Sequence, residues 1–579
     1  MKIRHSFQAL APSIIHDLVP IALRAYVPPN ANPKFRKAFR KRLGASNWTL
    51  IFDTETSTDS SQLLKIGGYQ LREGAALFEA GVFFDPEAIK QSEQDCVQHF
   101  AKQRGLQCKT VAEFVDDVFY GKAFELRATF VGFNLPFDLS RLAVRHGLAR
   151  GKMHGGFTFQ LSSDKYKPFV QIKHLSRLAA FIQFAGIKRR NDTKGMRKKQ
   201  IEPPIRRGAF IDVQTIAAAL TSQSFSLYGL ANFLKLESRK LETNEHGLVI
   251  TPDYVNYAVQ DAQVTWEAYQ ALVLKFEGHS LQNARLSQIL SEASLGRAYL
   301  KEMGIKPWRE VQPEFPEEVI GTIMSTYFGG RAEVHIRRKI ARVLYCDFLS
   351  MYPTVCTLMG LWRFVIANGM SFFDTTAETS DWLDNAKPDD LQSSTNWRRL
   401  ATLVQIHPDD DVLPVRAQYQ NEGATTIGLN HLKYEGALWF TLADCLASKF
   451  LNGKAPRVLK ALTFEAKERQ TDLQCINIGG AEGQKVNPVK DDFYRLLIDR
   501  RTNIKDSMKL ADPADKDRLE SEQLAIKILA NSTSYGIFVE INVEDLSEYE
   551  ARQCHFGGDN EFPIRTKKAE NAGPYFNPL

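Results

Sequence analysis

The sequence has no apolar run near the ~18 residues that a membrane-spanning helix needs, so we expect no membrane association. Cysteine is scarce: the chain has 7, and none lies in a CxxC pair, which argues against structural zinc and for reduced thiols. Residues 1–5 are not followed by the apolar stretch of a secretion signal, so we expect a cytoplasmic protein. The composition, 44% hydrophobic and 24% charged, is ordinary for a globular chain, and 579 residues suggest about three or four domains. The net charge of +7 has the sign of a nucleic-acid binder.

One stretch combines an apolar run with an acid and a turn. In Val343-Leu-Tyr-Cys-Asp347-Phe-Leu-Ser-Met-Tyr352-Pro353, the apolar residues predict a buried β-strand that ends in Asp347 at a sheet edge. A carboxylate in that place can bind a divalent cation, which prefers oxygen ligands. The same pattern also suits an ordinary strand whose Asp caps a turn.

Three further acidic segments follow one another in the first half of the chain. Trp48-Thr-Leu-Ile-Phe-Asp53-Thr-Glu55 predicts a strand whose two acids, at positions i and i+2, point to the same side. Asn134-Leu-Pro-Phe137-Asp138 follows a strand that breaks at Gly132, and it opens a predicted helix. Tyr257 and Asp261 lie four residues apart, on one face of another predicted helix. Singly, each has a structural explanation, such as a strand end, a helix cap or a core tyrosine beside a surface acid.

Together and in this order, DxE, NxxFD and YxxxD resemble the three exonuclease motifs of the DEDD 3′–5′ exonucleases of the tyrosine subtype, in the form found in family B DNA polymerases. The resemblance implies an RNase H-like domain with two Mg²⁺ or Mn²⁺ ions. Two such ions about 4 Å apart can activate the attacking water and stabilise the leaving oxygen of a phosphodiester.

The resemblance also assigns roles to these residues. Asp53, Glu55 and Asp261 would hold one ion, and Asp53 and Asp138 the other. Tyr257 would orient the attacking water, and Asn134 and Phe137 would contact the DNA. A further strand ending at Asp212 is expected in the same domain, with no catalytic role for this acid.

The segment Tyr327-Phe-Gly329-Gly330-Arg331 pairs two glycines, which tolerate positive φ and close backbone approach, with an arginine that suits phosphate. Alone it would be a hairpin turn. Shortly before Asp347, it resembles the YxGG segment of family B polymerases, especially the protein-primed enzymes of phages and linear plasmids. That resemblance makes Tyr327, Gly329, Gly330 and Arg331 DNA contacts, and it makes a terminal protein one partner to consider.

The stretch from Asp347 to Pro353 then resembles motif A of these polymerases, usually DxxSLYP, with Met351 in place of Leu. The resemblance implies that Asp347 binds the two catalytic metal ions. Phe348 would contribute its backbone to the triphosphate site, and Tyr352 would pack beneath the sugar of the incoming dNTP.

Two helices are predicted near the end of the sequence, from Phe493 to Met508 and from about Asp515 to Leu529. On the first helix, Arg501, Lys505 and Lys509 are spaced by four and form a basic face. On the second, Lys527 and Asn531 are also four apart and lie on one face. A solvent-exposed helical hairpin would look the same. In context the pair resembles polymerase fingers, and Arg501, Lys505, Lys527 and Asn531 would bind the nucleotide.

Motif B, KxxxNSxYG, is matched from Lys527 to Gly536 with one extra residue before Tyr535, which leaves the orientation of that tyrosine open. No strand-borne DTD of the motif C type follows Gly536, and no thumb follows. Because one carboxylate cannot hold two ions in a nucleotidyl-transfer geometry, we expect weak polymerase activity, or none, from this chain alone. A second polypeptide could supply motif C and the thumb, the sequence could be a fragment, or the remnant could act only as a nuclease or a DNA-binding module.

The expected fold is α/β and α+β multidomain: an RNase H-like 3′–5′ exonuclease domain, then an incomplete polymerase palm with a helical-hairpin fingers domain. The expected parts are a basic segment (1–47), the exonuclease domain (48–275), a helical linker (276–324), palm with YxGG and motif A (325–365), an insertion (366–432), further palm (433–488), fingers (489–540) and the start of the remaining palm (541–579).

The expected function is that of a bacterial, phage or plasmid DNA-directed DNA polymerase of family B with proofreading. It would act on a primer–template, a single-stranded 3′ end and dNTPs. One rival is a stand-alone 3′–5′ exonuclease. The other is a non-catalytic DNA-binding scaffold that uses the basic segments 187–207 and 495–509, although solvation alone explains the first of these equally well.

Overall fold

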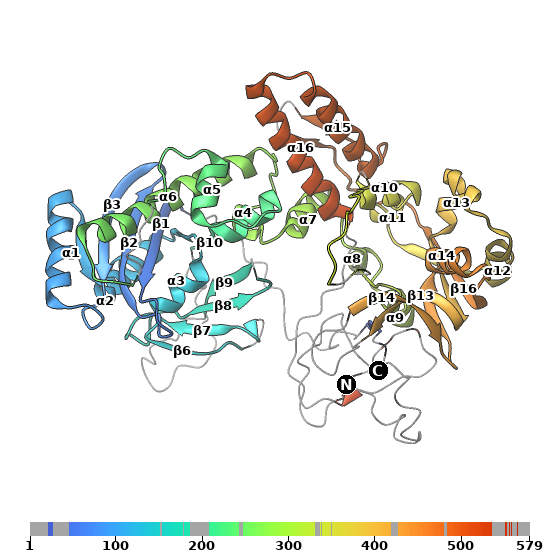
Figure 1. The fold of residues 1–579 in the computed structure, drawn as a ribbon, viewed down its shortest axis with the longest axis horizontal. Coiled ribbons are helices and arrows are strands. Elements are labelled where there is room, and N and C mark those ends of the chain that lie inside the picture. The colour runs from blue at the N-terminus through green and yellow to red at the C-terminus, as the bar shows by residue number, and fades with distance from the viewer. Residues whose placement is uncertain are drawn as a thin grey trace.

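The computed structural model describes residues 21, 23–26, 46–150, 153–177, 179–185, 208–241, 247–330, 336, 338–348, 350–417, 426–479, 483–534, 551–552, 555, 557 and 564–565. Within them, helices and several sheets form two groups that are joined by helices (Figure 1). The expected α/β multidomain class is therefore confirmed. None of the described helices is long and apolar enough to cross a membrane. The cysteines among these residues are free thiols.

The larger sheet has the strand order β10-β5-β1-β2-β3-β4. Its strands are β1 (Trp48–Thr56), β2 (Leu64–Glu73), β3 (Ala76–Phe84), β4 (Gln107–Thr110), β5 (Thr129–Gly132) and β10 (Phe210–Asp212). β1, β2 and β3 form an antiparallel meander, whereas β5 and β10 lie on the other side of β1 and run parallel to it. Because parallel neighbours end at the same edge of a sheet, the carboxyl ends of β1, β5 and β10 come together there.

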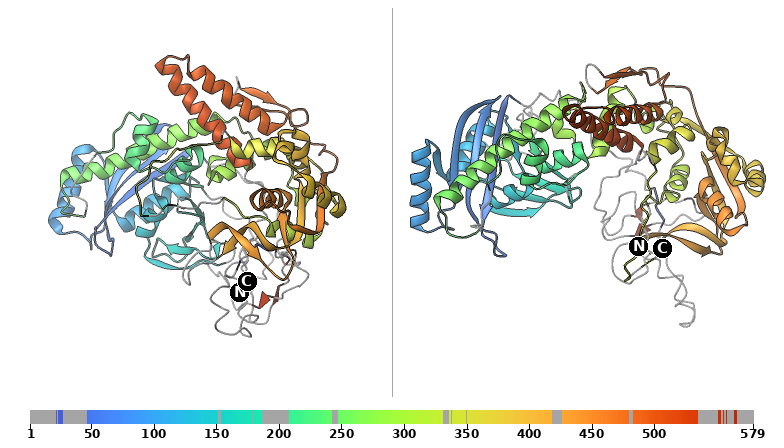
Figure 2. Two further views of the ribbon diagram at one scale, coloured as in Figure 1. Left: turned by 45° about the vertical axis from the view of Figure 1, so that its right-hand side comes forward. Right: turned by 45° about the horizontal axis from the view of Figure 1, so that its top comes forward.

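The helices of this first group pack around that sheet, and the right-hand view of Figure 2 shows the blue strands with α1 on their outer side. They are α1 (Gln91–Arg104), α2 (Val111–Glu113), η2 (Phe114–Phe124), α3 (Leu135–Arg141), α4 (Val213–Thr221), α5 (Leu227–Leu234) and α6 (Pro252–Glu277). Helix α6 packs against β1 and β2. The alternation along β1 sends Leu50 and Phe52 into an aromatic core and Ile51 toward Ala262 and Trp266 of α6. Asp53 and Glu55 continue on the side of Ile51, so they face α6.

A second, antiparallel sheet follows the order β6-β7-β8-β9. Its strands are β6 (Arg145–Leu148), β7 (Phe157–Gln160), β8 (Val170–His174) and β9 (Ala180–Phe184). Phe184 of β9 packs on Phe130 of β5, with 5.4 Å between the ring centroids, and on Phe119 of η2. The two sheets therefore share one aromatic core.

The range expected to be a helical linker (276–324) contains mainly helices after the end of α6. They are η4 (Leu286–Gln288), α7 (Glu292–Glu302), α8 (Trp308–Val311) and α9 (Glu317–Ser325). The second group of elements follows: α10 (Met351–Leu358), α11 (Trp362–Val365), β11 (Met370–Asp374), α12 (Thr376–Asn385), η5 (Pro388–Gln392), α13 (Ser394–Arg399), β12 (Thr402–His407), β13 (Asp409–Ala417), β14 (Thr426–Lys433), β15 (Leu438–Thr441), α14 (Leu442–Asn452), β16 (Arg457–Ala466), β17 (Ile476–Ile478) and β18 (Gln484–Val486). The short strands β19 (Ala551–Arg552) and β20 (Ile564–Arg565) pair with each other.

The main sheet of this group has the order β11-β16-β12-β15 and is antiparallel. Two of its strands, β11 and β12, come from the expected insertion (366–432), and the other two come from the expected further palm (433–488). Strands from the two expected parts are therefore hydrogen-bonded neighbours in one sheet. Local sequence could not reveal this, since strand pairing is a long-range choice.

The predicted helical pair is confirmed as α15 (Phe493–Met508) and α16 (Pro513–Ser534). α16 also packs against α4 and α7. Lys275 Nζ donates to Ser521 Oγ at 2.7 Å, and Lys235 Nζ lies 2.6 Å from Asp517 Oδ2. The pair is thus tied to the first group of elements as well as to the second.

The buried strand expected at Val343–Asp347 is wrong. Residues 341–348 belong to no helix or strand, and Val343, Leu344 and Tyr345 are 84%, 88% and 87% exposed. An extended segment becomes a buried strand only when neighbouring strands pair with its backbone and cover its faces. The described residues provide no such neighbour for this segment.

Several predictions fall outside the described residues. These concern Arg331, Tyr535, the basic segment 187–207, nearly all of the basic segment 1–47 and most of the range 541–579.

Candidate functional site

Three carboxylates from distant parts of the sequence meet beside the larger sheet. Asp53 and Glu55 leave the end of β1, and Asp261 comes from the middle of α6. One ligand oxygen from each lies within 4.8 Å of the others. Asp261 is buried, and Asp53 and Glu55 are half-buried. The strand period and the helix period place these side chains on facing sides of β1 and α6.

Asp138, on α3, is the fourth acid of this cluster. Its Oδ1 accepts hydrogen bonds from the backbone N of Thr54 at 3.2 Å and from Thr54 Oγ1 at 2.7 Å. Its Oδ2 is buried and has no hydrogen-bond partner among the described residues. A buried, unpaired carboxylate oxygen is costly, and a cation is a natural partner for it.

The electrostatics of the four acids show an excess of negative charge. Burial raises the pKa of Asp53 well above its usual value, and the charges of Asp138, Asp261 and Glu55 add to the shift. Burial, followed by the charge of Asp261, raises the pKa of Glu55 to about 8. Burial raises the pKa of Asp138 to about 7. Full ionisation at neutral pH thus needs a positive partner, and clustered carboxylate oxygens are the ligands that Mg²⁺ and Mn²⁺ prefer.

A lysine that the sequence analysis missed supplies part of that positive charge. The Nζ of Lys240 contacts Oδ2 of Asp261 and lies 4.7 Å from the centroid of the Tyr257 ring. Its charge lowers the pKa of both Asp53 and Glu55, against the effect of burial. No motif marked Lys240, because its nearness to Asp261 arises from tertiary packing and not from a sequence pattern.

Two tyrosines of α6 reach the cluster, although the sequence analysis named only one. Tyr257 hydrogen-bonds to Asp261, and burial together with the neighbouring acids raises the pKa of its hydroxyl. Tyr254 donates to Glu55 Oε2 at 3.2 Å, and its ring stacks on Tyr257 with centroids 6.0 Å apart. Both hydroxyls therefore stay protonated and can donate. The spacing of three between Tyr254 and Tyr257 on a predicted helix was the available signal.

Asn134 and Phe137, predicted as DNA contacts, lie at the start of the helix that carries Asp138. Asn134 is exposed and precedes α3. Phe137 is half-buried, and the Arg141 guanidinium carbon lies 5.0 Å from the centroid of its ring. An exposed amide and an accessible ring beside a cation are groups that can contact single-stranded DNA.

The second predicted site gathers Asp347 and the cations of the helical pair. Asp347 and Phe348 are exposed, and Tyr352, on α10, is 43% exposed. Arg501 Nη1 donates to Ser350 Oγ at 2.8 Å, and Arg501 Nε donates to Gln523 Oε1 at 2.8 Å.

The charges of this second site act on one another. Burial lowers the pKa of Arg501, and the charge of Asp347 opposes that shift. Burial, then Arg501 and Lys527, lowers the pKa of Lys505, again against the charge of Asp347. Lys527 is exposed and Asn531 half-buried on α16. Arg501 and Lys527 lie close enough to lower the pKa of Lys505, and a group of cations this close together forms a surface suited to an anion.

Lys509 departs from the predicted basic face. Its Nζ lies 2.7 Å from Asp506 Oδ1, and the residue follows the end of α15. Lys509 therefore forms an ion pair with an acid of its own helix, whereas no ion pair of Arg501, Lys505 or Lys527 is found within the described part of the chain.

The YxGG segment lies next to Tyr352. A Cβ on Gly330 would stand 3.8 Å from the Tyr352 hydroxyl, and Gly329 has a φ of +85°. Arg416 Nη2 donates to the carbonyl oxygens of Tyr327 at 3.1 Å and Phe328 at 2.9 Å. The Arg24 guanidinium carbon lies 4.1 Å from the centroid of the Tyr327 ring.

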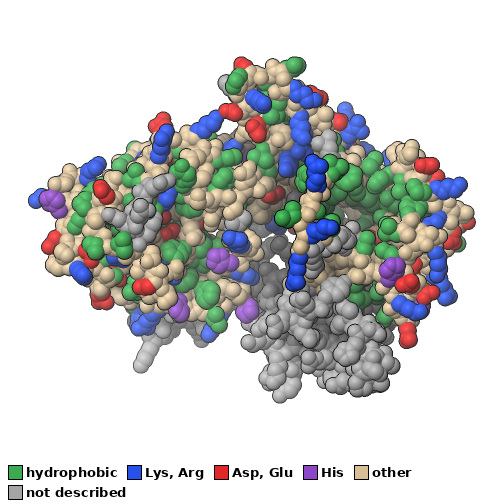
Figure 3. Space-filling model, viewed as in Figure 1, with side chains coloured by type: hydrophobic (Ala, Val, Ile, Leu, Met, Phe, Trp, Pro, Cys, Tyr) green, Lys and Arg blue, Asp and Glu red, His purple; other side chains and the backbone are tan. Residues whose placement is uncertain are grey.

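Figure 3 shows Lys and Arg side chains on the helical pair and in the region between the two groups of elements. Segment 338–348, which contains Asp347, carries the exposed cations Arg338, Lys339 and Arg342. The same segment carries exposed apolar side chains, among them Val343, Leu344 and Tyr345, so its surface is both basic and apolar.

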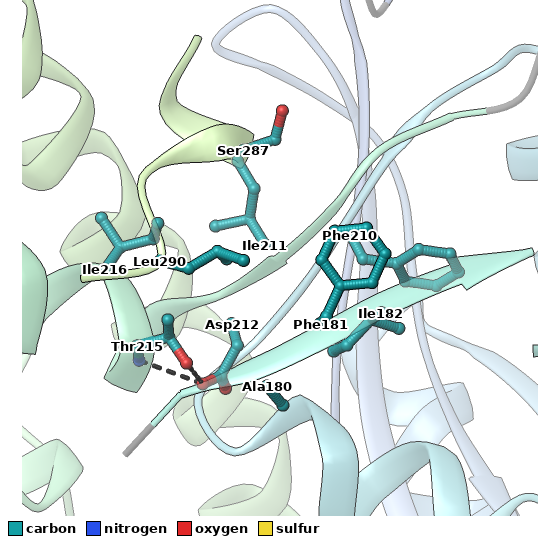
Figure 4. A pocket seen from close by; sticks show the side chains of 10 residues that line it. All are labelled: Ala180, Phe181, Ile182, Phe210, Ile211, Asp212, Thr215, Ile216, Ser287 and Leu290. Atoms are coloured by element: carbon teal, nitrogen blue, oxygen red, sulfur yellow. Dashed lines mark hydrogen bonds between the residues drawn. The ribbon is translucent and has the colours of Figure 1, made fainter. Parts of the chain in front are cut away.

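The described residues also enclose a small cavity of about 30 Å³ between β9, β10, α4 and the segment around η4 (Figure 4). Asp212 and Thr215 line one side of it. Its volume suits about one water molecule, so a nucleotide cannot bind there.

In comparisons with known proteins, no protein-family model matches the chain, and no curated protein matches it.

Proposed function

We propose that this chain is part of a family B DNA polymerase and that its first half is a 3′–5′ exonuclease. The observation that carries the proposal is the meeting of Asp53, Glu55, Asp138 and Asp261 beside Tyr257. These residues come from the three motifs that resembled the exonuclease motifs. Chance would not be expected to bring just these five side chains together.

The sheet of the first half supports the RNase H-like part of the proposal. An antiparallel meander of three strands is extended, beside its first strand, by two strands that run parallel to it. This mixed sheet, with β4 at its far edge, is compatible with the proposed RNase H-like domain. The acids lie at the carboxyl end of the central strand β1 and on elements next to it.

In this proposal the acids hold two divalent ions, which would activate water and stabilise the leaving oxygen of the 3′-terminal phosphodiester. The neighbouring side chains position the acids, balance their charge and orient the attacking water. Thr54 fixes one oxygen of Asp138, and Lys240 offsets the charge of Asp261. The protonated hydroxyl of Tyr257 stands next to Asp261, where it can orient the attacking water.

The second half is proposed as a partial palm and fingers. The charge of Asp347 acts on Arg501 and Lys505 of α15, and Lys527 of α16 acts on Lys505, so one acid and three cations lie close together; this supports a triphosphate site among them. Among the described residues, no group of three potential metal ligands includes Asp347. An acid of the motif C type, either on a second polypeptide or on residues outside this sequence, would complete the site, and the part that carries it would cover the exposed apolar residues of segment 338–348.

A stand-alone exonuclease is the second candidate. It is favoured by the contrast between the acid cluster around Asp53 and the exposed Asp347, which belongs to no such cluster of acids among the described residues. A DNA-binding scaffold without activity would leave four buried or half-buried acids with no purpose.

The test is incubation of the full chain with a 5′-labelled primer–template, Mg²⁺ and dNTPs. We expect shortening of the primer, its loss in Asp53→Ala and its retention in Asp347→Ala. Asp59→Ala is the matched control, since Asp59 is an exposed acid near the end of β1 that accepts hydrogen bonds from Ser57 and Ser61 and is not part of the acid cluster. Shortening that survives Asp53→Ala would refute the nuclease. Extension that is lost only in Asp347→Ala would favour the polymerase over the stand-alone exonuclease.

A further inference from the structure

A fifth acid, Asp212, lies behind the cluster and has both of its carboxylate oxygens occupied. Its Oδ2 accepts hydrogen bonds from the backbone N of Thr215 at 3.0 Å and from the Thr215 hydroxyl, and so caps helix α4 (Figure 4). Its Oδ1 accepts a hydrogen bond at 2.9 Å from the backbone N of Leu135. Asp212 is 7% exposed. With both oxygens used in this way, it is not a candidate metal ligand.

The bond to Leu135 joins Asp212 to the element that carries Asp138. Leu135 is the first residue of α3, and Asp138 follows within the first turn. The neighbouring backbone is held as well: β10 pairs with β5 so that Asp212 stands opposite Gly132, and Gln214 N donates to the Phe133 carbonyl at 3.1 Å. The turn between β5 and α3 is therefore fixed from the β10–α4 junction at more than one point.

The position of Asp138 leaves little room for error. A Cβ on Gly132 would stand 3.2 Å from Asp138 Oδ2 and 3.0 Å from a methyl carbon of Leu135. Thr54 holds the other oxygen, Oδ1. A shift of the start of α3 would move Oδ2, the oxygen that is free to bind a cation.

The chemistry requires a carboxylate here, although capping alone does not. Serine, threonine or asparagine caps a helix with one acceptor oxygen. Asparagine would keep one of the two acceptors and would turn its amide donor toward either the Leu135 or the Thr215 backbone N–H. Burying a further negative charge close to Asp138 is unfavourable, so the second acceptor must serve a purpose beyond the cap.

We propose that Asp212 is a positioning residue. Its hydrogen bond to the Leu135 backbone N–H positions Asp138, and it thereby raises the affinity of the acid cluster for the divalent ion that Asp138 helps to bind. This inference rests on the proposed function, because it needs the acids to bind metal. Groups that orient metal ligands through hydrogen bonds change metal affinity by about 10- to 100-fold when they are removed.

The experiment is a titration of the full chain with Mn²⁺ in the absence of DNA, followed by electron paramagnetic resonance. The variants are Asp212→Asn, Asp212→Ser, Asp138→Asn and the double variant Asp138→Asn/Asp212→Asn. Thr215→Val is the matched control, because it removes a hydrogen bond to the capping oxygen and leaves the bond to Leu135 intact. Asp212→Ser retains a cap for α4 but is too short to reach Leu135 as well.

We expect Asp212→Asn and Asp212→Ser to weaken Mn²⁺ binding by at least about tenfold, and Thr215→Val to leave it unchanged. The double variant should bind Mn²⁺ as Asp138→Asn does, since residues that act through one another are not additive. Unchanged binding in both Asp212 variants, additive losses in the double variant, or unfolding of both variants would overturn the inference and leave the proposed function standing. If the wild-type chain binds no Mn²⁺, the proposed function and this inference both fail.

Discussion

The hydroxyl of Thr54 donates a 2.7 Å hydrogen bond to Oδ1 of Asp138, a residue that lies 84 positions later in the chain. Thr54 stands between the two acids of β1, and its backbone N binds the same oxygen. One residue of the first motif thus fixes the acid of the second motif. This contact joins strand β1 to helix α3 at the cluster, and its consequences can be measured.

Removal of the Thr54 hydroxyl should move the pH dependence of the proposed nuclease. The hydrogen bonds from Thr54 lower the pKa of Asp138, against the burial that raises it to about 7. In Thr54→Val that pKa should rise further, so the acid limb of the pH–rate profile should shift to higher pH. The measurement is the rate of shortening of a 5′-labelled single strand between pH 6 and pH 9.

Thr49→Val is the control for this prediction. Thr49 lies on the same strand, is also buried and is not part of the cluster. Its pH–rate profile should match that of the wild type. A profile of Thr54→Val that coincides with the wild-type profile would show that the hydroxyl does not tune Asp138.

The stability of the metal-free protein should fall as the pH rises toward 8. The pKa of Glu55 is about 8 in the folded chain, against an ordinary value of 4.5. The folded state therefore binds this proton more tightly than the unfolded state does. The resulting stabilisation is complete below pH 4.5 and is lost as the pH rises through about 8.

Glu55→Gln should remove that dependence, so the variant should melt at a higher temperature than the wild type at pH 8 in EDTA. For a unit the size of the expected exonuclease domain (48–275), the gain should be about 2–4 °C for each kcal/mol of unfavourable burial and charge repulsion that the substitution removes. Mg²⁺ should raise the melting temperature of the wild type more than that of the variant. Melting curves at pH 5 and pH 8 test both statements.

Glu113→Gln should behave in the opposite way and is the matched control. Hydrogen bonds from the Thr110 backbone N and hydroxyl lower the pKa of Glu113. Its contribution to stability is present at neutral pH and is lost as the pH falls through that lowered pKa, so this variant should melt lower at pH 8. A stabilised Glu113→Gln would contradict the electrostatic argument.

The helical pair should bind triphosphate through Lys505 and Lys527 and not through Lys509. Lys505→Ala and Lys527→Ala should each weaken the binding of a fluorescent dNTP analogue by about tenfold at low salt, because a charge-assisted hydrogen bond contributes about 1.5 kcal/mol or more. Lys509→Ala should bind as the wild type does, since its Nζ is paired with Asp506 at 2.7 Å. Equal losses in the three variants would indicate nonspecific attraction to a basic helix.

The sequence alone determined which side of an element each key side chain leaves. The alternation of β1 put Asp53 and Glu55 on one side, and the helical period of α6 put Tyr257 and Asp261 on one face. The bounds of α15 also followed from its apolar period and from the proline after it. These are local properties, because neighbouring backbone torsions fix them within a few residues.

Tertiary structure alone decided which elements became neighbours. It brought Lys240 to Asp261 and Thr54 to Asp138, and it paired β12 with strands beyond the expected boundary at 432. It also left Val343–Asp347 exposed, although the apolar run predicted a buried strand. The physical reason is that burial and strand pairing are properties of two segments at once. A segment's own residues show what it can bury, and only its partner decides whether it does.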